Sequence, residues 1–260
     1  MGYETITVAE AGGVATITLN RPEVMNALSA RLRVELLSAW GEVEARARCI
    51  VLTGAGRAFC SGQDLQDAMA LGEGAFDLGR VLAEEYEPLL KAIYDCPVPT
   101  IAAVNGAAAG AGANLALACD VVIACESASF IQAFTRIGLI PDAGGTYWLP
   151  RQVGMARAMG AALFAEKIGA RQAVDWGMIW EAVPDEAFAA HVAARAGALA
   201  AGPTAAYRLV KQALRASPGN GLEAQLALEA RLQGEAGATA DFREGVAAFL
   251  EKRPARFTGA

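Results

Sequence analysis

The chain has 260 residues, of which 54% are hydrophobic, and its 22 basic and 28 acidic residues give a formal charge of −6. This length predicts one large domain, or a domain with a small extension. The acidic balance, with no block of like charge, argues against a general nucleic-acid binder, which needs a basic face. It does not exclude a phosphorylated ligand, because a few local cations or helix N-termini suffice to bind one.

Cysteine and histidine are too scattered for a His/Cys metal site. The five cysteines form no CxxC pair, and His191 is the only histidine, so we expect no metal. The opening residues show no signal peptide, and no uncharged apolar stretch reaches the roughly 18 residues of a membrane span. We therefore expect a cytoplasmic protein with reduced thiols that does not enter a membrane.

The first quarter of the chain predicts two strands, a helix and a third strand. Residues 3–8 and 14–19 alternate between apolar and polar types on either side of a Gly-Gly pair, which is typical of a hairpin. Apolar residues recur at helical spacing over 29–44. The short apolar run at 49–53 predicts a buried strand.

The middle of the chain repeats the alternation of strand and helix. We expect helices over 78–95 and 110–118, and buried strands over 100–104 and 121–124. This order predicts an α/β fold built from repeated ββα turns.

The pattern changes after about residue 200. Residues 203–249 have helical spacing throughout, interrupted by Pro218-Gly219. We therefore divide the chain into an α/β core, residues 1–200, and a C-terminal helical region, residues 201–260, that packs on the core or on a neighbouring subunit.

Two segments rich in glycine and alanine follow the predicted buried strands. They are 57–65 (RAFCSGQDL) and 105–114 (NGAAAGAGAN). Small residues let a ligand approach the backbone, and a helix start offers free N–H groups. Two such groups from separate loops would form an oxyanion hole for a carbonyl oxygen, although each turn alone is more typical of close packing.

A third segment, 138–146 (GLIPDAGGT), holds Asp142 in a Pro-Asp-Ala-Gly-Gly turn. Such a turn folds tightly and would aim the carboxylate at a substrate carbon. The turn by itself favours a plainer role for Asp142 as a helix N-cap, because Asp is a preferred cap.

In this order and spacing the three segments resemble those of the crotonase family, also called the enoyl-CoA hydratase/isomerase family. The likeness runs from 16–22 (TITLNRP) to 249–253 (FLEKR). It implies an α/β spiral of repeated ββα turns with a C-terminal helical extension. It also implies an acyl-CoA thioester substrate, no cofactor apart from the substrate's coenzyme A, and a homotrimer or a dimer of trimers.

The resemblance assigns roles to individual positions. It implies that the backbone N–H groups of Gln63 and Ala111 form the oxyanion hole for the thioester. Hydratases of the family have two glutamates where this chain has Asn114 and Phe134, and neither of these side chains transfers a proton. Asp142 stands where isomerases of the family have a catalytic acid. An apolar pocket beside Phe134 would raise its pKa and make it a better base.

The remaining assignments concern coenzyme A and the acyl group. Phe249 and Lys252 would reach a neighbouring subunit's site, although Lys252 is equally typical of a solvated helix end. Met69, Tyr86 and Trp148 either line the acyl pocket or pack in the core. The residues that the resemblance assigns to CoA or substrate binding are Met25, Ala27, Ala58, Ser61, Gly62, Asp64, Leu65, Gly110, Phe249 and Lys252.

Four segments look like the branch of the family that acts on a ring epoxide in bacterial phenylacetate breakdown. They are 138–146, 157–160, 176–180 and 242–250. The likeness implies conversion of ring-1,2-epoxyphenylacetyl-CoA to oxepin-CoA, and a shift of a 3,4 double bond to the 2,3 position. Alternatives are a 3,2-enoyl-CoA isomerase of fatty-acid oxidation, an enoyl-CoA hydratase, a hydrolase or dehalogenase with Asp142 as nucleophile, and a non-catalytic CoA-binding subunit.

Overall fold

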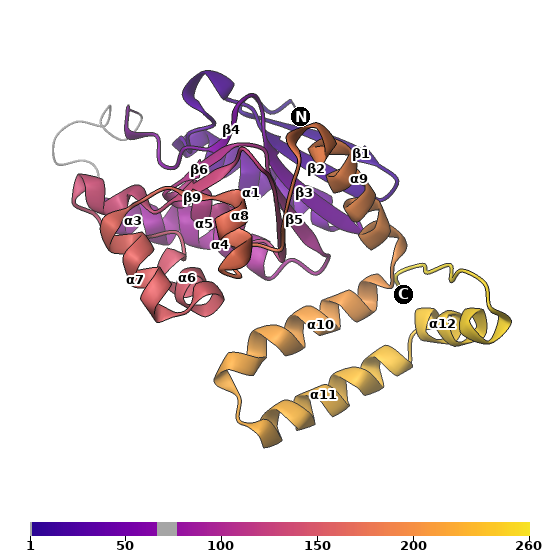
Figure 1. The fold of residues 1–260 in the computed structure, drawn as a ribbon. Coiled ribbons are helices and arrows are strands. Elements are labelled where there is room, and N and C mark those ends of the chain that lie inside the picture. The colour runs from indigo at the N-terminus through magenta and orange to yellow at the C-terminus, as the bar shows by residue number, and fades with distance from the viewer. Residues whose placement is uncertain (1, 67–76) are drawn as a thin grey trace.

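Two β-sheets and their covering helices form the core of the protein (Figure 1). The computed structural model describes residues 2–66 and 77–260. The strands are β1 Ile6–Ala11, β2 Val14–Leu19, β3 Cys49–Gly54, β4 Ala58–Cys60, β5 Thr100–Val104, β6 Ala107–Ala109, β7 Val121–Cys125, β8 Ser129–Ile131, β9 Ile168–Gly169 and β10 Glu181–Val183.

Helices occupy most of the remaining chain. The α-helices are α1 Ala30–Glu44, α3 Leu78–Val81, α4 Glu87–Tyr94, α5 Ala111–Leu117, α6 Gly145–Val153, α7 Met155–Phe164, α8 Ala170–Asp175, α9 Asp185–Ala201, α10 Thr204–Ala216, α11 Leu222–Gly237 and α12 Ala240–Glu251. The short helices are η1 Pro22–Val24, η2 Leu82–Tyr86, η3 Ala133–Ile137 and η4 Ser217–Gly219, of which η2 is a π-helix.

The strand order shows the repeated turns directly. The larger sheet runs β1-β2-β3-β5-β7-β10 and is parallel except for the β1–β2 hairpin. The smaller sheet runs β4-β6-β8-β9, with β4, β6 and β8 parallel. Each of β3, β5 and β7 in the large sheet is thus followed by a short strand in the small sheet. The predicted α/β spiral of ββα turns is confirmed.

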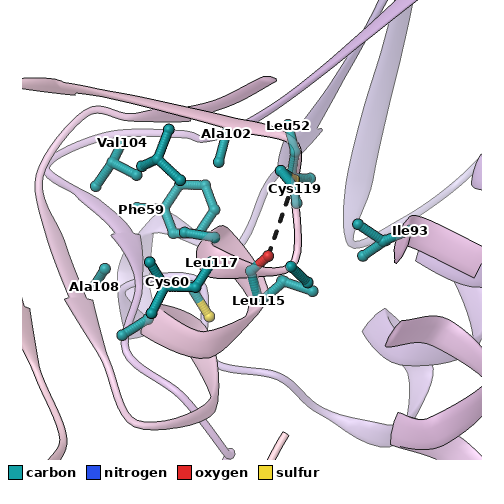
Figure 2. Close-up of a cluster of buried hydrophobic side chains, with 14 of the residues drawn as sticks. Leu52, Phe59, Cys60, Ile93, Ala102, Val104, Ala108, Leu115, Leu117 and Cys119 are labelled. Atoms are coloured by element: carbon teal, nitrogen blue, oxygen red, sulfur yellow. Dashed lines mark hydrogen bonds between the residues drawn. The ribbon is translucent and has the colours of Figure 1, made fainter. Parts of the chain in front are cut away.

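The buried side chains between the two sheets fix the position of α5. Figure 2 shows the ring of Phe59, from β4, among Val104 of β5 and Leu117 of α5. All three of these side chains are buried. Since α5 is held on this cluster, its N-terminus at Ala111 has a fixed place beside the small sheet.

Most predicted elements are confirmed, and the short strands were missed. The hairpin, the helix from 30 to 44, the buried strands β3, β5 and β7 and the helical tail all form. The strands of the small sheet have two or three residues each. Such pieces are too short to show an alternating pattern, so periodicity cannot distinguish them from loops.

The helical tail is tied to the core at its first helix and at both of its ends. Lys211 of α10 donates from Nζ to the carbonyls of Cys96 and Val98, at 2.6 and 2.7 Å. Arg48 of the core donates to the carbonyls of Gly202 and Phe257. Figure 1 shows α10 and α11 side by side, with α12 beyond the end of α11 that lies away from the turn between these two helices. The role of this region in oligomerisation stays a prediction.

Candidate active site

A cavity of about 330 Å³ lies where the small sheet, the start of α5 and the π-helix η2 meet. One wall is backbone from the two glycine-rich segments, and the other is mostly apolar side chains. Among its described lining residues, Asp142 is the only carboxylate and Arg136 the only cation. The backbone side is formed by Ser61, Gly62, Gln63, Gly110 and Ala111.

The two glycine-rich segments touch each other beside this cavity. Gly62 has φ +93°, and a Cβ there would lie 2.8 Å from the Ala109 carbonyl oxygen and 3.5 Å from the Ala111 nitrogen. Ala111 is the first residue of α5, so its N–H has no partner within the helix. No described residue accepts a hydrogen bond from the N–H of Gln63 or Ala111. The structure therefore brings both predicted donors to the same cavity.

The side chain of Gln63 is held in place by hydrogen bonds from Tyr86 and Arg33. Tyr86 donates to Gln63 Oε1 at 2.5 Å, and Arg33 Nη1 donates to the same oxygen at 3.0 Å. Arg33 is buried and pairs with Glu85 at 2.6 Å. Burial raises the pKa of Tyr86, which keeps its hydroxyl a donor. Glu85 and Tyr86 both belong to η2, so this π-helix braces the Gln63 loop.

Asp142 does not act as a helix cap. Helix α6 begins after Gly144, which is its N-cap and offers no side chain. The turn is tight, because Ala143 and Gly144 have φ values of 47° and 79°. Trp148 donates from Nε1 to the Ala143 carbonyl at 3.3 Å. The capping interpretation is therefore wrong, and the carboxylate lines the cavity instead.

Burial makes Asp142 a stronger base than a free aspartate. Its pKa is raised from 3.8 to about 6, mainly by desolvation. Its Oδ1 is buried and receives no hydrogen bond from any described residue. A carboxylate with a pKa near neutrality can both remove and return a proton at physiological pH.

The two positions where family hydratases have glutamates are also part of this site. Phe134 lines the cavity, and its ring lies beside Gly110. Asn114 is fully buried and donates from Nδ2 to the backbone carbonyl of Asp142 at 2.7 Å. The site thus has a phenyl ring in the cavity wall and a buried amide behind that wall, where hydration would need carboxyl groups.

The predicted CoA-binding residues divide into two groups. Ser61, Gly62, Leu65 and Gly110 line the cavity. The others do not line it in this chain, and Asp64 forms an ion pair with Arg21 at 2.8 Å. Those others are Met25, Ala27, Ala58, Asp64, Phe249 and Lys252.

The tail residues Phe249 and Lys252 lie on α12 and at its C-cap, where Phe249 is 82% exposed. Their predicted contact with a neighbouring subunit's CoA therefore stays a prediction.

Of the three candidate acyl-pocket residues, one lines the cavity. Tyr86 does so, and Trp148 packs instead against Tyr94 and Tyr147, with ring centroids 5.2 and 4.7 Å away. Met69 lies outside the described residues.

Several residues that line the cavity were not predicted from the sequence, although the sequence contains one pattern that points to three of them. The cavity wall includes Leu78, Val81, Leu82, Ala133, Arg136, Ile137 and Leu139. The apolar face of the predicted helix over 78–95 could have pointed to the first three. It did not, because an apolar helix face is far more often core than cavity wall.

The fold and the cavity together define the class of protein. Parallel ββα turns, with two glycine-rich loops facing one half-buried carboxylate, are the arrangement expected of crotonases. Residues 9–260 match the family model described as enoyl-CoA hydratase/isomerase. The chain belongs to this family.

The relatives carry different names. The chain is 68% identical over 259 residues to a probable enoyl-CoA hydratase from Rhodobacter capsulatus, covering 100% of both chains. It is 50% identical over 250 residues to 1,2-epoxyphenylacetyl-CoA isomerase from Escherichia coli, covering 95% of both. A crystal structure of a putative enoyl-CoA hydratase/isomerase from Mycobacterium abscessus superposes with a TM-score of 0.94 at 38% identity, covering 98% of this chain and 100% of that one.

The described part of the chain has no helix that is both long and apolar enough to cross a membrane. The five cysteines are buried and free.

Proposed function

We propose that this protein is an acyl-CoA isomerase that converts ring-1,2-epoxyphenylacetyl-CoA to oxepin-CoA and also shifts a 3,4 double bond to the 2,3 position. In this proposal Asp142 transfers the proton, and the N–H groups of Gln63 and Ala111 stabilise the thioester enolate. One observation carries the proposal: Asp142 is the only carboxylate among the described residues that line the cavity, and burial raises its pKa to about 6.

The double-bond shift needs one base and one oxyanion site. The Asp142 carboxylate removes a proton from C2 of the 3-enoyl thioester, and the electron pair moves onto the thioester oxygen as a dienolate. The two N–H groups donate to that oxygen. Protonated Asp142 then returns the proton at C4, which leaves the 2-enoyl thioester with no net gain or loss of atoms.

The same groups suit the epoxide substrate. The oxyanion site polarises the thioester, and Asp142 removes a proton from C2 and returns it to the ring. The C–C bond shared by the epoxide and the six-membered ring breaks, which gives the seven-membered oxepin at unchanged mass. The apolar wall, with Phe134 and Tyr86, suits an aromatic-derived ring, because such a ring gains from aromatic contacts. The 50% identity to the isomerase from Escherichia coli supports this substrate.

Hydration is the second candidate, because the relative at 68% identity is named a probable enoyl-CoA hydratase. Addition of water needs a base that removes a proton from the attacking water and an acid that protonates the neighbouring carbon. The cavity offers Asp142 alone for both tasks, since Asn114 and Phe134 hold the two other positions.

We extend the proposal to the assembly and the cellular setting. The protein acts as a homotrimer or a dimer of trimers in the cytoplasm, without a cofactor other than the coenzyme A of its substrate. The apolar residues exposed on α12, which include Phe249 and Leu250, support subunit contacts through the tail.

Product mass separates the two candidate reactions. Ring-1,2-epoxyphenylacetyl-CoA, generated in situ, is incubated with the protein and followed by ultraviolet spectrum and mass. The proposal predicts a new chromophore at unchanged mass. A product heavier by one water would establish hydration, and no conversion of either this substrate or a 3-enoyl-CoA would overturn the isomerase assignment.

A further inference from the structure

Asn114 and Gln132 form a buried amide pair behind the cavity. Both side chains are almost fully buried, at 0% and 1% exposure. Gln132 Nε2 donates to Asn114 Oδ1 at 2.8 Å, and Asn114 Nδ2 donates to the Asp142 carbonyl at 2.7 Å. Two uncharged amides therefore connect β8 and η3 to the turn that carries the acid.

The chemistry of the last acceptor fixes the direction of this chain of bonds. A backbone carbonyl only accepts, so the Asn114 atom facing Asp142 must be the amide nitrogen. Asn114 Oδ1 then faces Gln132, which must present its own nitrogen. No other arrangement of the two amides satisfies both contacts.

The bond acts on the acid's own peptide unit. The Asp142 carbonyl also accepts from the N–H of Gly145 at 2.8 Å. A Cβ at Gly145 would lie 2.3 Å from Asn114 Nδ2, so the turn rests directly on this amide. Ala143, between them, has φ 47°, a conformation that persists only where its surroundings enforce it.

We propose that Asn114 is a positioning residue for Asp142: its amide, held by Gln132, fixes the backbone of the turn that aims the carboxylate into the cavity. This inference rests on the proposed function of Asp142. The position that holds a proton-transferring glutamate in hydratases of the family thus serves here to orient a different acid. A glutamate would keep this hydrogen bond only while protonated, because an ionised carboxylate has no proton to donate to the Asp142 carbonyl.

Asn114→Leu tests the inference, because it keeps the bulk and removes both hydrogen bonds. Displacement of a catalytic group by about 1 Å costs about 10²-fold in rate, so we expect kcat for 3-enoyl-CoA isomerisation to fall about 10- to 100-fold. KM should stay within about twofold, because the thioester contacts are elsewhere. Thr100→Val is the control: it removes the two hydrogen bonds that the buried Thr100 hydroxyl, at the first residue of β5, makes with Asp120, at 2.9 and 2.8 Å, and should leave kcat unchanged.

The pH midpoint of kcat is a readout that loss of stability alone would not change. Release of the turn in Asn114→Leu exposes the Asp142 carboxylate to water, so we expect the acid limb of that variant's kcat–pH profile to move to lower pH. Gln132→Met removes the hydrogen bond that holds the Asn114 side chain, and it should lower kcat more than Thr100→Val does. It takes the place of Asn114→Leu if that variant does not fold.

The results distinguish this inference from the proposed function. If Asp142→Asn abolishes turnover while Asn114→Leu (or, where it does not fold, Gln132→Met) keeps kcat within twofold of wild type and leaves the pH midpoint in place, the positioning role is wrong and the function stands. If Asp142→Asn retains full turnover, the proposed function itself fails and Asn114 has no acid to position.

Discussion

Asp142 combines a chemical role with an energetic cost. Its carboxylate is placed in an apolar cavity, and the raised pKa of about 6 is caused by desolvation. The same loss of hydration that makes it a better base makes the ionised form less stable in the folded protein.

The pH dependence of turnover follows from the base role. Asp142 must be ionised to accept the C2 proton, so kcat/KM should rise with pH through a midpoint near 6 and level off above it. A pH–rate profile with a 3-enoyl-CoA thioester measures this midpoint. A midpoint near 4, the value of an exposed aspartate, would contradict the buried-base account.

Asp142→Asn should stabilise the fold at high pH. The folded pKa, about 6, lies above the ordinary 3.8, so the folded state binds the proton more tightly and loses stability as pH rises from about 4 to 6. After discounting for partial exposure, we expect the variant's free energy of unfolding to be higher by about 1–2 kcal/mol at pH 8. Denaturant melts should show this gain at pH 8 and no gain below pH 4.

At the scale of elements, helix starts position the site. The sequence predicts α1 from its spacing, and the structure adds that Ser29 is the N-cap, accepting from the N–H of Leu32 at 3.2 Å. Helix α1 in turn carries Arg33 to Gln63. The cap therefore contributes to the framework that holds one N–H donor.

Ser29→Ala removes this cap and should lower the free energy of unfolding by about 1 kcal/mol, with kcat nearly unchanged because tertiary packing still holds α1. Ser29→Asp is the matched variant, since Asp caps equally well and should restore stability. Urea melts measure both. Equal stability of Ser29→Ala and wild type would show that the cap contributes nothing.

Some elements could be predicted from the sequence and others could not. The strands β3, β5 and β7 and both glycine-rich loops were predictable, because buried strands and small residues leave clear patterns. The contacts of Gln63 with Arg33 and Tyr86 were not predictable. These partners are 30 and 23 positions away in the sequence, and only the fold brings them together. The catalytic role of Asp142 was predicted from a family resemblance, whereas the turn alone had favoured a helix N-cap, which the structure does not show.

At the scale of the whole molecule, the tail presents apolar side chains to solvent. Phe242, Val246, Phe249 and Leu250 of α12 are 43% to 82% exposed. Exposed apolar faces of this kind mark association surfaces. The proposed trimer would cover them.

Phe249→Asp should weaken that assembly, because it places a charge in an apolar contact. Light scattering should give wild type a molar mass of three or six times the 26.9 kDa of one chain. The molar mass of the variant should be lower, toward that of the monomer. Val34→Asp, at an exposed apolar position on α1, is the control and should not shift. A monomeric wild type would refute the proposed assembly.

The most direct test of the account is turnover of ring-1,2-epoxyphenylacetyl-CoA by wild type and Asp142→Asn, with Asp185→Asn as an exposed-carboxylate control. The account predicts that wild type and the control form an isomer of unchanged mass, and that Asp142→Asn loses about 10²–10⁴ in kcat while remaining folded. Full turnover by folded Asp142→Asn would contradict the central claim, because no other carboxylate among the described residues lines the cavity.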